Sequence, residues 1–460
     1  MRQSVTPGYS MLERKIFKDI KEAKEGEQYM YIALFEDADY DLLYPLTYMR
    51  PAYALRIGVY TLIDRATKTS DKVFLYMRDY LTKYFEWRMK HEGCSNVYIN
   101  KEVDDETLFI NGKVVFDEKF EELLSKLKEK KGDYIVLKEG DIVAIKASSN
   151  LAKEISQYFM KPVSSEVYEA IKEKVEKIEI PDITLARFPW DIIKVNSEMV
   201  AKDLKEFVGK EWESGVDVTI IGDKKNAYIG KNVEIEPYVV IEARTGPVYI
   251  GDNTKVQAGA RIEGPTYIGK DTIIVGGAQI REGSNIGDVC RVGGEFEESV
   301  MHGFSNKYHA GFIGHAYVCE WVNIGAMTTN SDLKNTYGTV RLTIRGQKID
   351  TGMKKVGCFI GDMAKTAIGA YIYTGKRIGL ASQVHGYITS DVPSFTFYAK
   401  SLGGVLVELY VDSVIETQRR MKARRKQPLP PEEAELIRKL FEITAPEREK
   451  AGVKKGKISL

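Results

Sequence analysis

The second half of the chain carries a regular repeat, and its period constrains the fold more than any other feature of the sequence. Ile-Gly pairs mark the repeat. The last three pairs are evenly spaced, and the first step is longer because Thr-Gly-Pro is inserted at 245–247. Each even step makes three hexads, and each hexad has one aliphatic residue at a fixed position beside a small or turn residue. The pairs are Ile229-Gly230, Ile250-Gly251, Ile268-Gly269 and Ile286-Gly287.

A hexad repeat of this kind predicts a prism of stacked coils. Each hexad forms a short strand and a turn, three hexads close one triangular coil, and coils stack through parallel backbone hydrogen bonds. The aliphatic residues point into the prism, while glycine and small residues relieve the corners. We therefore expect a left-handed parallel β-helix over 214–397. The alternative is an antiparallel β-sandwich with glycine-rich turns.

The repeat is not continuous. It fades at 295–316, returns at 322–327, is interrupted at 328–338 and returns from 357 to 386. In solenoids such interruptions are loops that project from one face, and ligands often bind there. Past Pro393, the segment 402–426 predicts one long helix and 432–444 a second. We expect 398–460 to form a C-terminal helical tail.

The first half of the chain follows a different pattern, in which short apolar strands alternate with helical segments. This alternation favours an α/β domain with a mainly parallel sheet. We place this domain at 29–213, after a charged helical arm at 1–28. The expected elements are strands at 31–35, 73–77 and 96–100, helices at 56–68 and 120–132, and a hairpin at 134–147.

Composition excludes several classes of function. The formal net charge of +1 gives no basic surface for a nucleic-acid partner, and no apolar run is long enough to span a membrane. The first residues lack the apolar core of a signal peptide. The four cysteines form no Cys-x-x-Cys pair, so neither a zinc site nor a redox site is expected. A cytoplasmic location with reduced thiols is the prediction.

Chemistry in such a prism must take place on its outside, because aliphatic side chains fill the interior. A groove between two prisms is the natural place, which predicts a homo-oligomer, most plausibly a homotrimer. Three of the five histidines, His302, His309 and His315, fall in the loop-rich part of the repeat. A histidine can accept the proton of an attacking amine or hydroxyl during acyl transfer. The alternative for His309 is a structural histidine that bonds to the backbone.

The stretch 293–338, GGEFEESVMHGFSNKYHAGFIGHAYVCEWVNIGAMTTNSDLKNTYG, carries a specific resemblance. It resembles the acetyltransferase half of the bifunctional N-acetylglucosamine-1-phosphate uridylyltransferase/glucosamine-1-phosphate N-acetyltransferase family, in a divergent branch found mainly in Bacteroidetes. The segments 31–62, 189–196 and 360–379 match other parts of that branch. The resemblance runs from about 30 to 397. It implies a nucleotidyltransferase-like α/β domain joined to a hexapeptide-repeat acyltransferase that uses acetyl-CoA.

The resemblance also assigns roles to individual positions. His309 matches the catalytic base, and Asn323 matches an asparagine beside the acceptor. Phe312 and Ser331 stand where the family has tyrosines, and Glu297 stands where it has a substrate-binding lysine. An acidic group there would repel a sugar phosphate, which puts glucosamine 1-phosphate in doubt as the acceptor. The implied substrate-binding residues are Arg281, Lys307, Phe312, Asn330 and Lys334, and the implied acetyl-CoA contacts are Ala326, Lys365 and Thr366.

The N-terminal domain lacks the glycine-rich loop with which nucleotidyltransferases of this kind hold phosphates. The strand at 31–35 leads instead into an acidic run, with Asp37, Asp39 and Asp41. Arg50 and Arg56 are the candidates for binding a nucleotide phosphate, or they pair with the acidic run. Mg²⁺ would be required only if this domain is active, and no metal ligands are assigned.

Three hypotheses follow for the function. The first is an acetyl-CoA-dependent N-acetyltransferase that acts on an amino sugar or amino-sugar 1-phosphate in sugar-nucleotide biosynthesis. The second is a sugar-1-phosphate nucleotidyltransferase in which the β-helix serves assembly or regulation, and a bifunctional enzyme would combine the two. The third is a non-catalytic trimeric scaffold or sensor of sugar nucleotides.

Overall fold

The computed structural model describes residues 30–163, 166–212 and 218–457. The chain separates into two compact units. The first contains residues up to Leu43, Met49–Leu55 and Tyr60–Arg187, and the second contains Tyr44–Tyr48, Arg56–Val59 and Phe188–Leu460. The helical arm predicted at 1–28 lies outside the described residues. The sequence analysis places the domain boundary at 213, whereas the contacts place the segment from Phe188 onward in the second unit.

The first unit is built on a seven-stranded sheet of order β3-β2-β1-β4-β6-β5-β7. Strands β1, β2, β3 and β4 run parallel, while β6 is antiparallel to β4 and β5. This confirms the α/β prediction, including the hairpin of β5 and β6. The strands are β1 (Tyr31–Phe35), β2 (Val73–Tyr76), β3 (Val97–Ile99), β4 (Thr107–Asn111), β5 (Tyr134–Lys138), β6 (Asp141–Ala147) and β7 (Glu176–Glu179).

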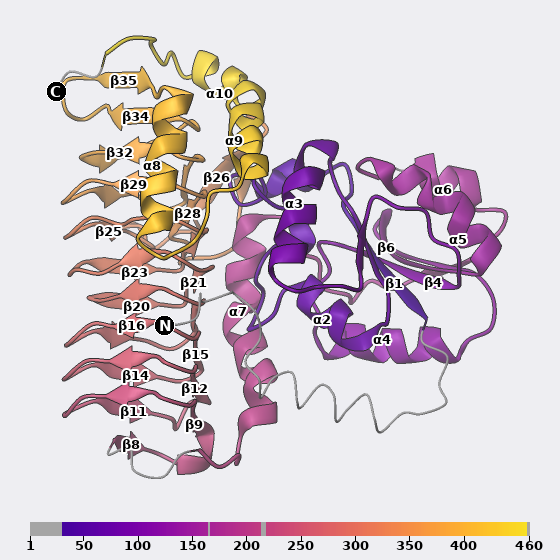
Figure 1. Ribbon diagram of the computed structural model, residues 1–460, viewed down its shortest axis with the longest axis horizontal. Helices are drawn as coiled ribbons and strands as arrows, with labels where there is room; N and C mark the ends of the chain where they lie inside the picture. Colours follow the sequence, from indigo (N-terminus) through magenta and orange to yellow (C-terminus); the bar gives the residue numbers. More distant parts are fainter. Residues whose placement is uncertain (1–29, 164–165, 213–217, 458–460) are drawn as a thin grey trace. The chain divides into compact units, whose positions relative to one another are not determined.

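Helices pack on this sheet because each buries an apolar stripe against it. In Figure 1, α2 and α4 lie on one side of β1, β4 and β6, and α5 and α6 lie on the other. Leu151, Ile155 and Phe159 share one core cluster with Phe35 and Phe109 of the sheet. The helices are α2 (Leu62–Thr69), α3 (Asp79–His91), α4 (Glu118–Glu129), α5 (Ser149–Ser156) and α6 (Glu166–Ile171), with short 3₁₀ turns η1 (Tyr40–Leu43), η2 (Ala52–Ala54) and η3 (Tyr158–Met160).

The helix predicted at 56–68 starts later than expected, since α2 begins at Leu62. Two local features explain this. Gly58 has a φ of 72°, in the left-handed region, so the chain cannot be helical there. Thr61 then caps α2 by accepting from the backbone of Asp64, whose carboxylate accepts from the Thr61 backbone in return.

The second unit is the predicted prism of parallel strands, and the left-handed β-helix prediction is confirmed. From β8 to β24, strands that follow one another along the chain go to different sheets, and each strand pairs in parallel with the one a full coil later in its sheet. The register Ile250↔Ile268↔Ile286 reproduces the three-hexad repeat, and all three side chains are fully buried. Figure 1 shows the coils stacked from β8 at one end to β35 at the other.

The strands of the prism are short, as the hexads require, and three sheets run along it. The first sheet holds β10 (Glu234–Ile235), β13 (Lys255–Val256), β16 (Ile273–Ile274), β19 (Arg291–Val292) and β22 (Asn306–Lys307). The second holds β8 (Thr219–Ile221), β11 (Val240–Glu242), β14 (Arg261–Glu263), β17 (Gln279–Ile280), β20 (Glu295–Glu297) and β23 (Phe312–Gly314). The third holds β9 (Ala227–Ile229), β12 (Val248–Ile250), β15 (Thr266–Ile268), β18 (Ser284–Ile286), β21 (Val300–Met301), β24 (Tyr317–Val318), β28 (Cys358–Ile360) and β31 (Lys376–Ile378).

The β-helix continues through 295–316, where the sequence repeat fades. Ile286 pairs with Met301, and Met301 pairs with Val318, so these coils are shorter than the regular coil from Ile268 to Ile286. In the second sheet the inward positions are still apolar, with Phe296 and Ile313 fully buried. The expected loop at this point is therefore wrong, because a shortened coil breaks the periodicity of the sequence without breaking the stack.

A real insertion follows one coil later. Val318 pairs with Ile360, more than twice the step of a regular coil, yet the register of the third sheet is kept. The extra residues form an antiparallel hairpin of β26 (Arg341–Ile344) and β27 (Gln347–Asp350). Above it the prism resumes with β25 (Thr329–Asn330), β30 (Tyr371–Ile372) and β33 (Tyr387–Ile388) on one side and β29 (Lys365–Thr366) and β32 (Gln383–Val384) on another.

The long helix predicted at 402–426 begins later than expected. Its first residues form β35 (Val405–Glu408), which pairs antiparallel with β34 (Thr396–Ala399) and ends the prism. Gly403 and Gly404 both have positive φ and make the turn between these strands. The two predicted C-terminal helices then follow as α8 (Val411–Ala423) and α9 (Pro431–Ile443), and a third, α10 (Ala445–Lys450), forms in the charged end, where no helix was predicted.

Helix α7 (Pro189–Leu204) runs along the prism in Figure 1 and packs against β15 and β18. Two buried asparagines fix it there: Asn196 donates to the Gly283 carbonyl at 2.8 Å, and Asn285 donates to Asn196 Oδ1 at 2.9 Å. Short 3₁₀ turns η4 (Lys205–Phe207) and η5 (Lys224–Asn226) lead into the first coil. Within the described residues, no helix is both long and apolar enough to cross a membrane.

A carboxylate in α10 should make stability depend on pH. Glu447 accepts from the Tyr48 hydroxyl and from the Ser394 backbone at 3.0 Å, and burial raises its pKa to about 7. The folded chain then binds more protons than the unfolded chain between about pH 4.5 and 7, so stability falls as the pH rises through that window. We expect a loss on the order of 1–3 kcal/mol between pH 5 and 7.5.

Glu447→Gln, which cannot ionise, is the matched control for this prediction. Unfolding of both proteins by denaturant across pH 5–8 checks it. The wild type should lose stability relative to Glu447→Gln as the pH rises, and parallel pH profiles for the two proteins would contradict the assignment.

Candidate functional site

His309 lies at a corner of the prism, in the turn between β22 and β23. Its side chain is exposed, and its ring meets the Tyr308 ring edge-on at 5.2 Å. One coil above, Met327 donates to the Ala310 carbonyl at 2.8 Å, which stacks the turn containing Ala326 directly on the His309 turn. The structure therefore brings together the predicted base and the predicted acetyl-CoA contact Ala326 at one corner.

Glycines allow these turns to stack so closely. Gly311 has a φ of 125°, and a Cβ there would lie 2.1 Å from the Thr328 carbonyl oxygen. In the coil below, a Cβ on Gly293 would lie 2.1 Å from the Tyr308 carbonyl oxygen. Larger residues at either place would push the turn outward, so the local sequence fixes where the imidazole is presented.

Asn323 lies on the neighbouring face, in a ladder with Asn306 below and Lys365 above. The Asn306 amide donates to Asn323 Oδ1 at 3.3 Å, and Arg425 donates to Asn306 Oδ1 at 2.7 Å. These side chains line a pocket of about 250 Å³ between the prism and α8. The pocket is lined by Phe304, Asn306, Asn323, Lys365, Arg420, Met421, Arg424 and Arg425.

The pocket is basic, and none of the described residues that line it carries a carboxylate. Burial lowers the pKa of Lys365 to about 8. The pKa of Arg425 is also lowered, first by burial and then by repulsion from Arg291 and Arg424. Arg420 is paired with Glu416 at 3.1 Å, but the other lining cations still give the pocket an excess of positive charge that favours an anion such as phosphate.

Two of the four predicted site residues below, Asn330 and Thr366, point into the prism, and the other two, Phe312 and Lys334, have contacts of their own. Asn330 is 1% exposed and points into the prism, where it both donates to and accepts from the Gly314 backbone at 2.9 Å. Thr366 also points inward, accepting from the Gly325 backbone at 2.8 Å. Phe312 lies flat over Gly314, since a Cβ on that glycine would be 2.2 Å from the Phe312 ring. Lys334 lies half-buried at the start of the insertion, near Gly338.

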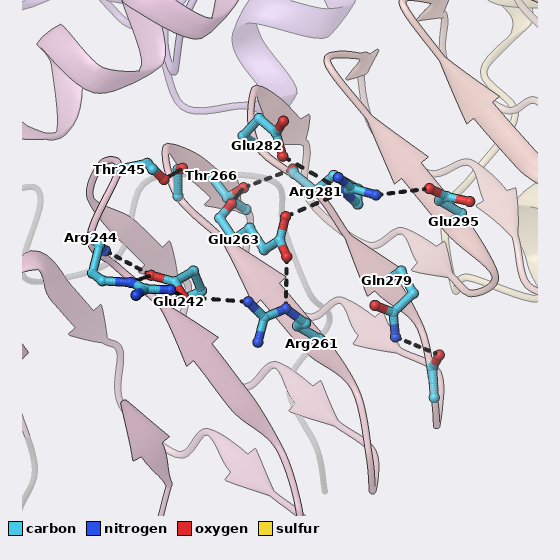
Figure 2. Close-up of polar contacts among 12 residues, drawn as sticks. Glu242, Arg244, Thr245, Arg261, Glu263, Thr266, Gln279, Arg281, Glu282 and Glu295 are labelled. Atoms are coloured by element: carbon cyan, nitrogen blue, oxygen red, sulfur yellow. Dashed lines mark hydrogen bonds and ion pairs between the residues drawn. The ribbon is translucent and has the colours of Figure 1, made fainter. Parts of the chain in front are cut away.

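Arg281, the predicted phosphate ligand, belongs to a ladder of charged side chains on the second sheet (Figure 2). Its guanidinium lies 3.3 Å from Glu263, 3.7 Å from Glu282 and 3.4 Å from Glu295. Burial opposes its charge, but the surrounding carboxylates outweigh burial and raise its pKa. The same ladder continues downward from Glu263 through Arg261 to Glu242. In this arrangement the charge of Arg281 is already neutralised.

The structure also shows a histidine–carboxylate pair that the sequence analysis did not assign. His315 Nδ1 lies 2.8 Å from Asp332 Oδ2, and both side chains are mostly buried. Burial alone would raise the pKa of Asp332, but its contact with His315 and the positive charge of Lys355 together outweigh burial and lower the pKa. The available signal was their spacing, because the step from His315 to Asp332 equals the step of the coil from Met301 to Val318.

In the first unit, the ends of β1 and β4 meet at the point where the strand order reverses, the usual ligand position in an α/β sheet. The carboxylates here are paired with cations. Glu36 contacts Arg78 at 3.0 Å, and Asp37 contacts Lys113 at 2.6 Å and the Asn111 amide at 2.9 Å. These groups do not fit a Mg²⁺ site, since fixed cations occupy the carboxylate oxygens that a divalent ion would need.

The two predicted nucleotide-binding arginines belong to different units, and each has partners within its own unit. Arg50 belongs to the first unit and is 1% exposed, and its carbonyl accepts from Arg78 at 2.8 Å. Arg56 belongs to the second unit, where its guanidinium donates to the Val59 carbonyl and its backbone donates to the Tyr317 hydroxyl at 2.9 Å.

Comparisons with known proteins agree with this two-part architecture. A sequence model described as "Sugar nucleotidyl transferase" matches residues 32–210, and one described as "Bacterial transferase hexapeptide (six repeats)" matches 247–282. The uncharacterized acetyltransferase YaiX of Escherichia coli is 34% identical over 36% of this chain and 74% of its own length. The chain belongs to the hexapeptide-repeat acetyltransferases. Its first unit matches the sugar nucleotidyl transferase model, so the chain joins a nucleotidyltransferase-like domain to the β-helix.

Two relatives named as bifunctional match this chain over smaller shares of their own length than YaiX does. The bifunctional sugar-1-phosphate nucleotidylyltransferase/acetyltransferase of Sulfurisphaera tokodaii is 30% identical over 39% of this chain and 44% of its own length. The bifunctional protein GlmU of Methanococcus aeolicus is 29% identical over 51% and 53%. The chain thus spans about half the length of these curated relatives. A solved UDP-N-acetylglucosamine acyltransferase of Francisella novicida aligns at 14% identity over 52% of this chain and 92% of that chain, with a TM-score of 0.30, too low to carry an argument.

Proposed function

We propose that this hexapeptide-repeat protein is an acetyl-CoA-dependent N-acetyltransferase that acts on an amino sugar or an amino-sugar 1-phosphate in sugar-nucleotide biosynthesis. The observation that carries the proposal is the exposed His309 at a prism corner, one coil below Ala326. The neighbouring face holds the basic pocket that contains Asn323 and Lys365. A base and a site for the donor's phosphates on adjacent faces are what acyl transfer from a nucleotide-bearing thioester requires.

In this reaction His309 takes the proton of the acceptor amine as its nitrogen attacks the thioester carbonyl. A C–N bond forms, the C–S bond breaks, and the sulfur of coenzyme A leaves with a proton. A backbone amide at the His309 corner, or Asn323, is the proposed donor to the oxyanion. The Oδ1 of Asn323 already accepts from Asn306, so its amide nitrogen is the group that faces a ligand. Such a donor typically contributes about 3–4 kcal/mol.

The basic pocket is the proposed site for the phosphates of acetyl-CoA, with Lys365 and Arg425 as ligands. Arg425→Ala should raise KM for acetyl-CoA about 10-fold and leave kcat nearly unchanged, because a charged hydrogen bond to a remote phosphate binds ground and transition state alike. Steady-state kinetics with varied acetyl-CoA measure this. Arg419→Ala on the same helix is the matched control, because Arg419 pairs with Glu416 and does not line the pocket. Equal KM values in both variants would remove the pocket from the donor site.

We propose that a second copy of the chain covers the exposed apolar side chains near His309. Ile368, one coil above Ala326, is 78% exposed, and Met327 is 56% exposed. Tyr371 and Tyr387 stack at 5.3 Å on the adjoining face and are 43% and 53% exposed. A monomer seldom leaves such a row in water. We propose a homotrimer in which a neighbouring prism completes the groove, and sedimentation equilibrium measures its mass.

The decisive experiment is a thiol-release assay with purified protein, acetyl-CoA and a panel of amino sugars, each with and without a 1-phosphate. Release of coenzyme A that depends on one acceptor supports the proposal and identifies the substrate. Comparing each amino sugar with its 1-phosphate also tests the effect of Glu297 and of the glutamates around Arg281. These carboxylates should weaken the binding of a phosphate. Absence of release with every acceptor would contradict an N-acetyltransferase of this class.

The alternative is sugar-1-phosphate nucleotidyl transfer by the first unit, with the β-helix in an assembly or regulatory role. The match of residues 32–210 to the sugar nucleotidyl transferases favours it. Against it, Asp37 and Glu36 are paired with Lys113 and Arg78. Pyrophosphate release from nucleoside triphosphates and sugar 1-phosphates, with and without Mg²⁺, tests it. A scaffold or sensor would show neither activity. The proposed enzyme is cytoplasmic and acts on small molecules, and we propose no nucleic-acid or membrane partner for it.

A further inference from the structure

Lys307 occupies a position of the prism that the repeat reserves for aliphatic side chains. In the first sheet the inward residues pair in the order Val256, Ile274, Val292 and Lys307, from one coil to the next. Ile324 follows in the coil above. The Lys307 side chain is 1% exposed, so it cannot contact a substrate in the way the sequence analysis predicts.

The ammonium group of Lys307 reaches two backbone carbonyls. Its Nζ donates to the Gly293 carbonyl in the coil below at 2.9 Å and to the His309 carbonyl at 2.6 Å. Gly294 leaves space for this group, because a Cβ there would lie 2.7 Å from Lys307 Nζ. An amine at the end of a four-carbon chain is thus inserted under the corner that carries the imidazole.

Among the described residues, the backbone bonds between coils fall on either side of the His309 carbonyl. Gly293 donates to the Lys307 carbonyl from below, and Met327 donates to the Ala310 carbonyl from above. The His309 carbonyl lies between these two bonds and accepts from Lys307 Nζ instead. The side-chain bond of Lys307 therefore bridges the interval in the backbone pattern at this turn.

An amine at this place works against stability. Burial lowers the pKa of Lys307 to about 8, which reflects the unfavourable transfer of its charge out of water. An aliphatic residue would fill the same column at no such cost, and replacing buried charges by apolar side chains is often stabilising. Residues that disfavour folding in this way tend to serve a site.

We propose that Lys307 is a positioning residue for His309: from inside the prism it ties down the carbonyl of His309 and so holds the turn 308–311 in place. The tie itself is a property of the fold. Its consequence for catalysis rests on the proposed acetyltransferase function, because a base must be held to within a fraction of an ångström to act efficiently.

Lys307→Met tests the tie, since methionine fills the column but cannot donate. Hydrogen exchange followed by mass spectrometry should show at least about 10-fold faster exchange of the Gly293 and Met327 amides, which donate to the carbonyls of Lys307 and Ala310 on either side of the tie, with peptides from 261–286 unchanged. The melting temperature should stay the same or rise. The kcat should fall about 10- to 100-fold, with KM for acetyl-CoA unchanged. Ile274→Met, two coils below in the same column and nearly unchanged in volume, is the matched control and should alter neither exchange nor kcat.

The outcomes separate the tie from the proposed function. Unchanged exchange of the Gly293 and Met327 amides overturns the inference, whatever the activity. Faster exchange in a protein whose wild type releases no coenzyme A supports the tie and contradicts the acetyltransferase. Faster exchange with an unchanged kcat overturns the positioning role. If Lys307→Met does not fold, Lys307→Gln replaces it, because the shorter amide keeps a donor but cannot reach both carbonyls.

Discussion

His309→Gln should lower kcat for acetyl transfer by about 10²- to 10⁴-fold, the usual contribution of a general base. Glutamine keeps the size and polarity of the side chain but cannot accept the amine proton and release it again. Because the imidazole is exposed, the melting temperature should barely change. KM for acetyl-CoA should also stay the same, because the donor's phosphates are assigned to the adjacent face. Thiol release under saturating acceptor measures the effect.

The control for this prediction is His315→Gln in the same unit. His315 is the histidine already held by a carboxylate, Asp332, at 2.8 Å, and such a pair is a familiar arrangement for a catalytic base. If His315→Gln loses activity while His309→Gln keeps it, the base lies at the other end of β23 and the assignment of His309 is wrong. Loss in His309→Gln alone supports it.

Phe296→Ala should cause the largest loss of stability among single changes in the prism, about 3–5 kcal/mol. Phe296 is fully buried in the column between Ile280 and Ile313, in one of the shortened coils. Removing its ring leaves a cavity that a stack fixed by hydrogen bonds above and below can close only in part. The midpoint of denaturant unfolding of the β-helix, followed with a probe in that unit, measures the loss.

Tyr238→Ala serves as the control, since Tyr238 lies on the same prism and is 87% exposed. Its effect should remain within about 0.5 kcal/mol. A similar loss in both variants would mean that the prism resists local cavities less than its packing suggests. A small loss in Phe296→Ala alone would show that neighbouring coils shift to fill the space.

The architecture of the prism could be read from the sequence because its period is strict and local. Ile250, Ile268 and Ile286 recur at equal steps, and each pairs with the next in register. The prediction failed where the chain changes its step, because Met301 and Val318 keep the pairing although both of their coils are shortened. It failed again at Val405–Glu408, where two glycines turn an apparent helix start into an edge strand.

The site was predictable in its place but not in its side-chain directions. His309 and Ala326 come together because they are one coil apart. Whether a residue faces the core or the solvent depends on register, and one residue of difference reverses it. Lys307 and Asn330 fell on inward positions, which their polar character conceals in the sequence. The neutralisation of Arg281 depends on glutamates from different strands, and linear sequence does not display that neighbourhood.

The stacking of Asn306, Asn323 and Lys365 on successive coils shows that the prism places side chains at regular intervals along its axis. Adjacent parallel strands are spaced by about 4.8 Å, so groups on different coils are separated by multiples of that step. A substitution changes the side chain on one coil, whereas adding or removing a coil changes the distance between two groups by one whole coil spacing. The distance from the proposed base to the proposed phosphate site can therefore change only in discrete steps. This restricts the lengths of acyl donor that a prism of this kind can bind.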